Sequence, residues 1–184
     1  MKINFDPRTT LLIVALEDEL PRVLVNNWDV VYCGVGKVNA TMTLCDALVT
    51  FQPQTVINYG TAGTLQSNLS GLHEVTRFLQ RDMDVRAMGF ALGQTPFEEQ
   101  MVIDSGFNGL SCGTGDLFVS AQPEMKTDLV DMEAFALAKV CSHKKVEFRC
   151  FKFISDGADA DAADDWPRHM AAGADRFVRT ILNQ

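Results

Sequence analysis

Short apolar runs recur along the chain, and glycine or charged residues interrupt each of them. Runs of this length, without polar alternation, are typical of strands that are covered on both faces of a sheet. The pattern predicts strands at the following positions: 10–16, 30–33, 55–58, near 73–78, 110–113, 117–120 and 146–154.

Apolar residues recur with helical spacing between these runs, over residues 37–50, 131–141 and 166–182. The acidic triplet 17–19 indicates the start of a further helix, because carboxylates favour the positive end of the helix dipole. Strands that alternate with helices predict one α/β domain over residues 1–184, with helices on both faces of its sheet.

Composition narrows the function classes. The chain has 184 residues, 47% of them hydrophobic, and a net charge of -8, which disfavours nucleic acid and anionic membrane surfaces as partners. We find no signal peptide and no apolar run long enough to span a bilayer, so we expect a cytoplasmic protein. The five cysteines have irregular spacing and are expected to be reduced core thiols. The three histidines form no metal-binding pattern, and we expect no metal and no cofactor.

The segment FKFISDGAD, residues 151–159, carries the strongest chemical signal. It puts Asp156 at the carboxyl end of a buried strand, where open α/β sheets bind their ligands. Glu133, at the start of a predicted helix, is a second candidate. Two carboxylates from separate elements suggest acid/base chemistry on a polar small molecule. An aspartate at a strand end can also simply cap the next helix.

Two glycine-containing segments are less specific. Residues 34–37, GVGK, fail the phosphate-loop pattern because Val38 follows the lysine, and a tight strand-to-helix turn is the favoured interpretation. Residues 58–63, NYGTAG, are predicted to form a loop of small residues after a strand. This loop is either an ordinary turn or a place where backbone approaches a ligand.

Seven segments together resemble the 5'-methylthioadenosine/S-adenosylhomocysteine nucleosidases of the purine nucleoside phosphorylase superfamily. In order along the chain they are ALEDEL, GVGKVNA, VINYGTAGTL, DMDVRAMGFALGQTPF, SCGTGDLFVS, VDMEAFALAKVC and FISDGAD. The resemblance implies a nucleoside phosphorylase-like fold, a three-layer α/β/α sandwich around a twisted mixed β-sheet. It also implies a homodimer that acts in methionine salvage. The implied reaction is hydrolysis of the N-glycosidic bond of 5'-methylthioadenosine or S-adenosylhomocysteine, giving adenine and a thioribose product.

The resemblance also assigns roles to residues. Asp156 would be the general acid for the purine, Ser155 would orient it, and Glu19 would hold the attacking water. Glu133 would bind the ribose hydroxyls, with Met132 packed against the sugar. The remaining expected substrate-binding residues are Phe118, Val119, Thr61, Ala62, Gly63, Val35, Leu16, Trp166, Phe90 and Met88. The chemistry agrees, since breaking a glycosidic C–N bond creates positive charge on the ribose and negative charge on the base.

The chain departs from the family at two charged positions. Lys152 stands where these nucleosidases usually have an arginine near the water, and Arg86 is unusual beside a pocket for an apolar alkylthio group. An inward Arg86 would favour S-adenosylhomocysteine, whereas the more common outward orientation would favour methylthioadenosine. The alternatives are a purine nucleoside phosphorylase, a nucleosidase for another modified nucleoside, and a binding protein without activity. The acidic triplet 17–19 favours water over phosphate as the acceptor.

Overall fold

The computed structural model describes residues 4–169 and 172–182. Its strands belong to one mixed sheet. They are β1 Thr10–Val14, β2 Asp29–Tyr32, β3 Thr55–Thr64, β4 Leu72–Gln80, β5 Val102–Asp104, β6 Leu110–Thr114, β7 Leu129–Asp131 and β8 Glu147–Asp156. The helices are α1 Lys37–Phe51, α2 Ala134–Lys144, α3 Ala162–His169 and α4 Ala172–Phe177, with short 3-10 helices η1 Arg22–Val25 and η2 Arg86–Met88 and a π-helical turn η3 Val178–Leu182.

The two longest strands, β3 and β8, lie parallel and in register along nearly their whole length. On its other side β8 pairs with β4, which pairs with β6, and β6 pairs with β7. The end of β7 returns to the end of β3, so these five strands close a ring. Strands β1 and β2 extend the sheet from the free part of β3, and β5 extends it from β4.

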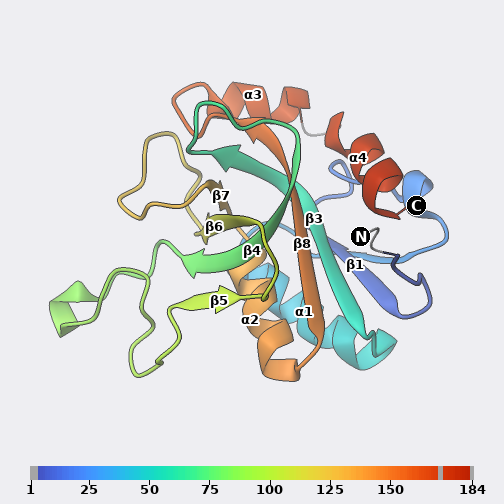
Figure 1. The fold of residues 1–184 in the computed structure, drawn as a ribbon, viewed down its shortest axis with the longest axis horizontal. Coiled ribbons are helices and arrows are strands. Elements are labelled where there is room, and N and C mark those ends of the chain that lie inside the picture. The colour runs from blue at the N-terminus through green and yellow to red at the C-terminus, as the bar shows by residue number, and fades with distance from the viewer. Residues whose placement is uncertain (1–3, 170–171, 183–184) are drawn as a thin grey trace.

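Helices cover both faces of this sheet (Figure 1). On one face α1 and α2 bury Leu44 and Leu137 against the strands. On the other face α4 and the segment around η1 form a second core, in which Tyr59 stacks on Phe177 with ring centroids 4.4 Å apart. The central strands between the two layers are therefore buried on both faces, as their apolar runs predict. The expected three-layer α/β/α architecture is confirmed.

Three local predictions were wrong. Residues 58–63 continue β3 instead of forming a loop, because their small side chains fit between β8 and the strands on the other side. Residues 17–19 form a turn and not a helix, since the Leu16 amide donates to the Glu19 carboxylate. Residues 117–120 form no strand.

Two helix boundaries also differ. The sequence predicts a helix from residue 131, but residues 129–131 pair with β6 as strand β7 and α2 begins at Ala134. The predicted closing helix over 166–182 is divided among α3, α4 and η3. Residues 170–171 between α3 and α4 lie outside the described residues.

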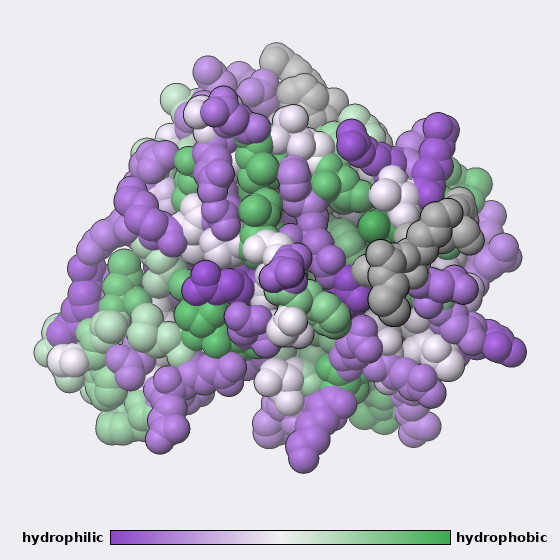
Figure 2. Space-filling view, viewed as in Figure 1, coloured by the Kyte–Doolittle hydropathy of each residue, from purple (hydrophilic) through white to green (hydrophobic). Residues whose placement is uncertain are grey.

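One segment leaves the sheet after β4. This arm, residues 83–100, contains η2 and projects at the left of Figure 1. Met88 and Phe97 in the arm are 63% and 90% exposed. Figure 2 shows apolar side chains gathered at this edge of the molecule. Apolar surface of this kind is a common feature of interaction sites.

Candidate active site

A cavity of about 360 Å³ opens where the ends of β1, β3, β7 and β8 approach one another. Thirteen of the fifteen residues expected to form a substrate site line it: Leu16, Glu19, Val35, Thr61, Ala62, Gly63, Phe118, Val119, Met132, Glu133, Ser155, Asp156 and Trp166. Segments spread over most of the sequence thus meet at one cavity.

Asp156 ends β8 and is fixed through both carboxylate oxygens. The Ser155 hydroxyl donates to Oδ2 at 2.7 Å, and the Ala158 amide donates to Oδ1 at 2.9 Å. On the β3 side, a Cβ atom at Gly63 would lie only 2.6 Å from Asp156 Oδ1. Position 63 therefore has to be glycine for the carboxylate to occupy this place, since real Cβ contacts are essentially never so short.

Glu19 is the one buried member of the acidic triplet, while Glu17 and Asp18 are exposed. Its Oε1 accepts hydrogen bonds from the Thr61 amide at 2.8 Å and from the Thr61 hydroxyl at 2.7 Å. The indole of Trp166 donates in turn to the Thr61 hydroxyl at 2.8 Å. A carboxylate held by charge-assisted bonds of this kind is oriented before any ligand arrives.

Glu133 lies just before the first residue of α2 and is buried. Its Oε1 accepts a hydrogen bond of 2.8 Å from the amide of Gly36, whose φ of 96° requires glycine. Burial, and then the negative charge of the neighbouring Asp131, raise the pKa of the Glu133 carboxyl to about 7. Glu133 can consequently change its protonation state near neutral pH.

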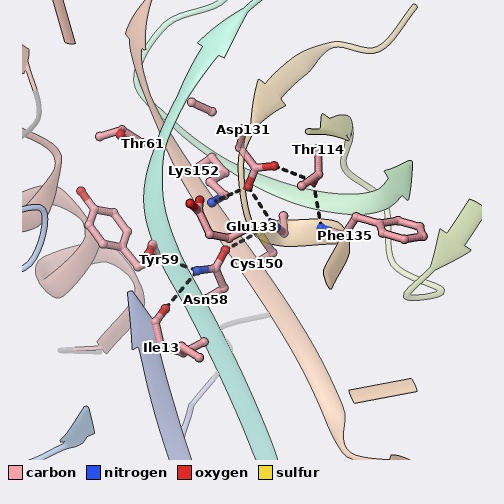
Figure 3. Close-up of polar contacts among 12 residues, drawn as sticks. Ile13, Asn58, Tyr59, Thr61, Thr114, Asp131, Glu133, Phe135, Cys150 and Lys152 are labelled. Carbon is pink, nitrogen blue, oxygen red and sulfur yellow. Dashed lines mark hydrogen bonds and ion pairs between the residues drawn. The ribbon is translucent and has the colours of Figure 1, made fainter. Parts of the chain in front are cut away.

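A buried ion pair lies beside Glu133 (Figure 3). Lys152 on β8 contacts Asp131 Oδ2 at 2.8 Å, and their side chains are 2% and 1% exposed. Burial by itself would lower the pKa of Lys152 and raise that of Asp131. Their mutual attraction outweighs burial, so the pKa of Lys152 lies well above and that of Asp131 below its ordinary value.

Asp131 also organises the start of α2 (Figure 3). Its Oδ2 accepts a bond from the Ala134 amide at 2.9 Å, and its Oδ1 accepts one from the Thr114 hydroxyl at 2.6 Å. Thr114 in turn accepts from the Phe135 amide at 2.9 Å. The pair therefore fixes the turn that presents Glu133 to the cavity. The sequence signal for it was the acid within VDMEA together with a lysine in an apolar strand.

Arg81 lines the cavity and was not predicted. Its guanidinium donates to the carbonyl groups of Gly113 and Gly115, each at 3.2 Å, and to that of Leu117. It thereby holds the loop that carries Phe118 and faces the cavity. An arginine directly after the apolar strand β4 was the available signal in the sequence.

Met88 and Phe90 do not line the cavity of this chain. Their expected place in a substrate pocket, in part that of a second subunit, stays a prediction. They belong to the projecting arm, where Phe90 packs edge-on against Phe97 with centroids 5.5 Å apart. Arg86, in the same arm, is bound by two carboxylates, Asp84 at 2.7 Å and Glu124 at 2.6 Å. The Arg86 guanidinium therefore points away from the cavity of its own chain.

The described residues contain neither a metal-binding cluster nor a membrane-spanning helix. No group of three or more histidine, cysteine, aspartate or glutamate side chains in this part of the chain could hold a metal ion. No helix within it has the length and apolarity needed to cross a membrane.

Comparisons with known proteins identify the family and agree with this fold. The model of the phosphorylase superfamily matches residues 112–183. The 5'-methylthioadenosine/S-adenosylhomocysteine nucleosidase of Glaesserella parasuis is 32% identical over 189 residues, covering 86% of this chain and 81% of the relative. The protein of that name from Haemophilus ducreyi is 36% identical over 176 residues, covering 81% and 75%.

Among solved structures, futalosine hydrolase of Helicobacter pylori superimposes with a TM-score of 0.84 at 21% identity, over 94% of this chain and 96% of that one. At this identity the match shows a shared fold alone. The two curated relatives share more sequence over most of both chains. The chain therefore belongs to the 5'-methylthioadenosine/S-adenosylhomocysteine nucleosidase family.

Proposed function

We propose that the protein is a purine nucleosidase that hydrolyses the N-glycosidic bond of an adenine nucleoside, 5'-methylthioadenosine or S-adenosylhomocysteine. The products are adenine and the corresponding thioribose. The observation that carries the proposal is the meeting of three carboxylates, Glu19, Glu133 and Asp156, around one cavity. Each comes from a different element and is held by its own hydrogen bonds.

Asp156 is assigned to the leaving group. As the C–N bond breaks, its electron pair moves onto the purine, and a proton from the Asp156 carboxyl neutralises the nitrogen that receives this charge. Ser155 donates to one oxygen of Asp156 and the Ala158 amide donates to the other, which fixes the direction of proton transfer. Phe118 and Val119, on the same cavity wall, are assigned to the base.

Glu133 is assigned to the ribose. A carboxylate can accept hydrogen bonds from two neighbouring hydroxyl groups, and its negative charge favours the cationic sugar of the transition state. The assignment is supported by its burial beside Met132, which also lines the cavity and can pack against the ring.

Glu19 is assigned to the water. Its Oε1 is occupied by both donors of Thr61, whereas Oε2 accepts only a longer bond of 3.3 Å from the Leu16 amide. A water bound at Oε2 can give its proton to Glu19 while its oxygen attacks the anomeric carbon. Glu19 gains one proton from the water and Asp156 gives one to the base, so the total charge of the site is unchanged by the reaction.

Water is favoured over phosphate as the acceptor. Phosphorolysis needs cationic side chains at the attacking oxygen. Of the described residues that line the cavity, Arg81 alone is cationic, and its guanidinium is bound to three carbonyl groups. Lys152 is paired with Asp131.

The test is chromatography of the products formed from methylthioadenosine in phosphate-free buffer and in phosphate. Hydrolysis predicts equal adenine release in both buffers and a free thioribose. Strict dependence on phosphate, with a ribose 1-phosphate product, would assign the protein to the phosphorylases instead.

The 5' end of the substrate should be uncharged. Ala15, Leu16 and Val35 supply apolar lining, and Arg86 is engaged by Asp84 and Glu124. A homocysteine tail would then find no cation for its carboxylate. Comparison of kcat/KM for methylthioadenosine, S-adenosylhomocysteine and adenosine tests this, and methylthioadenosine is expected to be the best of the three.

The oligomeric state, the metabolic role and the cellular location are also proposals. A homodimer is supported by the exposed apolar residues of the projecting arm and of α1, among them Met88, Phe97, Val38 and Met42. In that arrangement Met88 and Phe90 would reach the 5' end of the partner's substrate. Action in methionine salvage remains a prediction from the resemblance, and a cytoplasmic location remains a prediction from the sequence pattern.

A further inference from the structure

A network of three charged residues lies outside the cavity but touches the loops that form its wall. The Lys37 ammonium contacts Asp82 Oδ1 at 2.6 Å and Asp116 Oδ2 at 3.6 Å. The Lys37 amide donates to Asp116 Oδ1 at 2.8 Å, and the Asp116 amide donates to Asp82 Oδ2 at 2.9 Å. Each residue is thus bound to both of the others.

The three residues belong to three segments that each contribute to the site. Lys37 begins α1, directly after Gly36, whose amide binds Glu133. Asp82 follows Arg81 at the end of β4 and precedes the projecting arm. Asp116 belongs to the loop 115–119. The network therefore joins the ribose side, the arm and the base side of the proposed site.

The loop 115–119 is held on the cavity side by Arg81, through the carbonyl groups of Gly115 and Leu117. It contains no regular secondary structure, and Leu117 is 71% exposed. A Cβ atom at Gly115 would lie 2.9 Å from Arg81 Cζ and 3.0 Å from Asp82 Cγ, so the loop is packed closely against the end of β4. Polar contacts hold this loop from two sides, those of Arg81 and those that Asp116 makes with Lys37 and Asp82.

Partial burial and opposite charges stabilise the contacts of this network. The side chains of Lys37 and Asp82 are only 17% and 20% exposed, and that of Asp116 is 48% exposed. Burial would raise the pKa of Asp82, but the Lys37 ammonium and the Asp116 amide outweigh it and lower that pKa. Asp82 is accordingly ionised at neutral pH, and its bonds to Lys37 and Asp116 are charge-assisted.

We propose that Lys37, Asp82 and Asp116 form a positioning network that holds the loop 115–119 against the purine. None of the three lines the cavity, so they act through the loop and not on the substrate. The link to the purine rests on the proposed function, in which Phe118 and Val119 meet the base. Whether the three residues hold the loop in place can be tested without any ligand.

The first test is hydrogen exchange of the wild-type protein and the Lys37→Met variant. Met keeps the length of the side chain but removes the ammonium. We expect the Asp116 amide to exchange about tenfold faster in the variant, because Asp82 loses its cationic partner. Lys37→Arg should restore most of the protection, because the charge returns. Equal exchange of the Asp116 amide in wild type and Lys37→Met would overturn the network.

Lys126→Met is the matched control. It makes the same substitution farther along the same irregular segment, at an exposed lysine that donates a 3.4 Å bond to Gln122. Exchange of residues 115–119 should be unchanged in this variant. A thermal melt of each protein shows that the exchange is compared between folded states.

The second test measures the affinity for free adenine by calorimetry, together with kcat and KM. In Lys37→Met we expect adenine to bind about tenfold more weakly and KM to rise by a similar factor, with a smaller change in kcat. Asp82→Asn should add little once Lys37 is replaced, because the two act on one contact. Two results would overturn the link between the network and the base. One is that the losses of adenine affinity from the two substitutions simply add, and the other is that Lys37→Met exchanges faster in the loop but binds adenine as the wild type does.

Failure of the proposed function has a different signature. A wild-type protein that releases no adenine from any nucleoside would remove the proposed reaction, and the exchange experiment would still decide whether the network holds the loop.

Discussion

Asp156 is held in a geometry that suits one chemical task. Its two oxygens are bound by Ser155 and by the Ala158 amide, and the absence of a side chain at Gly63 leaves it room. An asparagine can occupy the same space and accept some of these bonds, but it cannot donate a carboxylic proton. A comparison of aspartate and asparagine at position 156 therefore distinguishes ligand binding from proton transfer.

We therefore predict that Asp156→Asn folds and binds adenine but turns over substrate about 10²–10⁴-fold more slowly, the usual loss for a general acid. Single-turnover kinetics and adenine calorimetry measure the two properties. Ser155→Ala is the graded comparison, since it removes one orienting bond and leaves the acid, and it should lose less. Turnover of Asp156→Asn close to that of the wild type would exclude Asp156 from the mechanism.

Glu133 links the site to pH-dependent stability. Burial and the charge of Asp131 raise its pKa from the ordinary 4.5 to about 7. The folded protein therefore holds this proton more tightly than the unfolded chain does. The resulting stabilisation is complete below about pH 4.5 and is lost as the pH rises through about 7.

The predicted measurement is the free energy of unfolding of wild type and Glu133→Gln at pH values from 5 to 8. Glutamine stays neutral, so the wild type should lose stability relative to the variant as the pH rises. The amide oxygen can keep the bond from Gly36, which makes the substitution a close match. If the difference in free energy of unfolding between the two proteins stays constant across this pH range, burial does not raise the pKa of Glu133.

At the scale of elements, β8 carries two buried cations in different surroundings. Lys152 faces Asp131, whose side chain is 1% exposed, while Arg149 binds Glu74, whose side chain is 22% exposed. Removal of a cation leaves its partner with a buried, uncompensated charge. The cost depends on how well water can reach the carboxylate that remains.

We predict that Lys152→Met lowers the free energy of unfolding by about 3–5 kcal/mol. Arg149→Met should cost less, because Glu74 is already partly hydrated. Lys152→Met combined with Asp131→Asn should recover most of the loss, since the double variant buries no charge and Asn can still accept from the Ala134 amide. Chemical denaturation of the four proteins checks the order. Equal costs for the two single variants would contradict it.

The elements also show what the sequence could and could not predict. Apolar runs located six of the eight strands, at least in part, because burial on both faces requires a run of apolar residues. The short strands β5 and β7 were not predicted. The extension of β3 through residues 59–64 was missed, since small residues occur both in tight turns and in closely packed strands. The turn at Glu19 was missed because its bonds to Thr61 join residues 42 positions apart.

For the site, motif resemblance identified thirteen of the lining residues, whereas spacing alone pointed mainly to Asp156 and Glu133. The roles of three further residues depend on contacts with partners from other strands and loops: Asp131, Lys152 and Arg81. The register of neighbouring strands determines which residues face each other, and this register cannot be predicted from a local sequence pattern.

At the scale of the whole molecule, the projecting arm leaves apolar side chains in water. Phe97 is 90% exposed, and α1 presents Val38 and Met42 on its outer side. Association with a second copy would bury these residues, as most soluble oligomers do through a symmetric interface.

We predict that sedimentation at micromolar concentration gives twice the chain mass of 20.3 kDa. Met42→Glu should shift the equilibrium toward monomers, because an interface core does not accept an unpaired charge. Val23→Glu, at another exposed apolar residue on η1, is the control and should remain dimeric. A wild-type monomer would contradict the dimer.

The closed ring of strands has a consequence for how the protein acquires activity. Asn58 and Cys150, which are 92 positions apart, face each other across β3 and β8. Pairings of such long sequence separation form late and slowly, because the chain entropy of closing the loop has to be overcome first. The three carboxylates are brought together only by this closure. During synthesis, catalysis must therefore wait until β8 has emerged and joined β3, and recovery of activity after denaturation reports the closure of this ring.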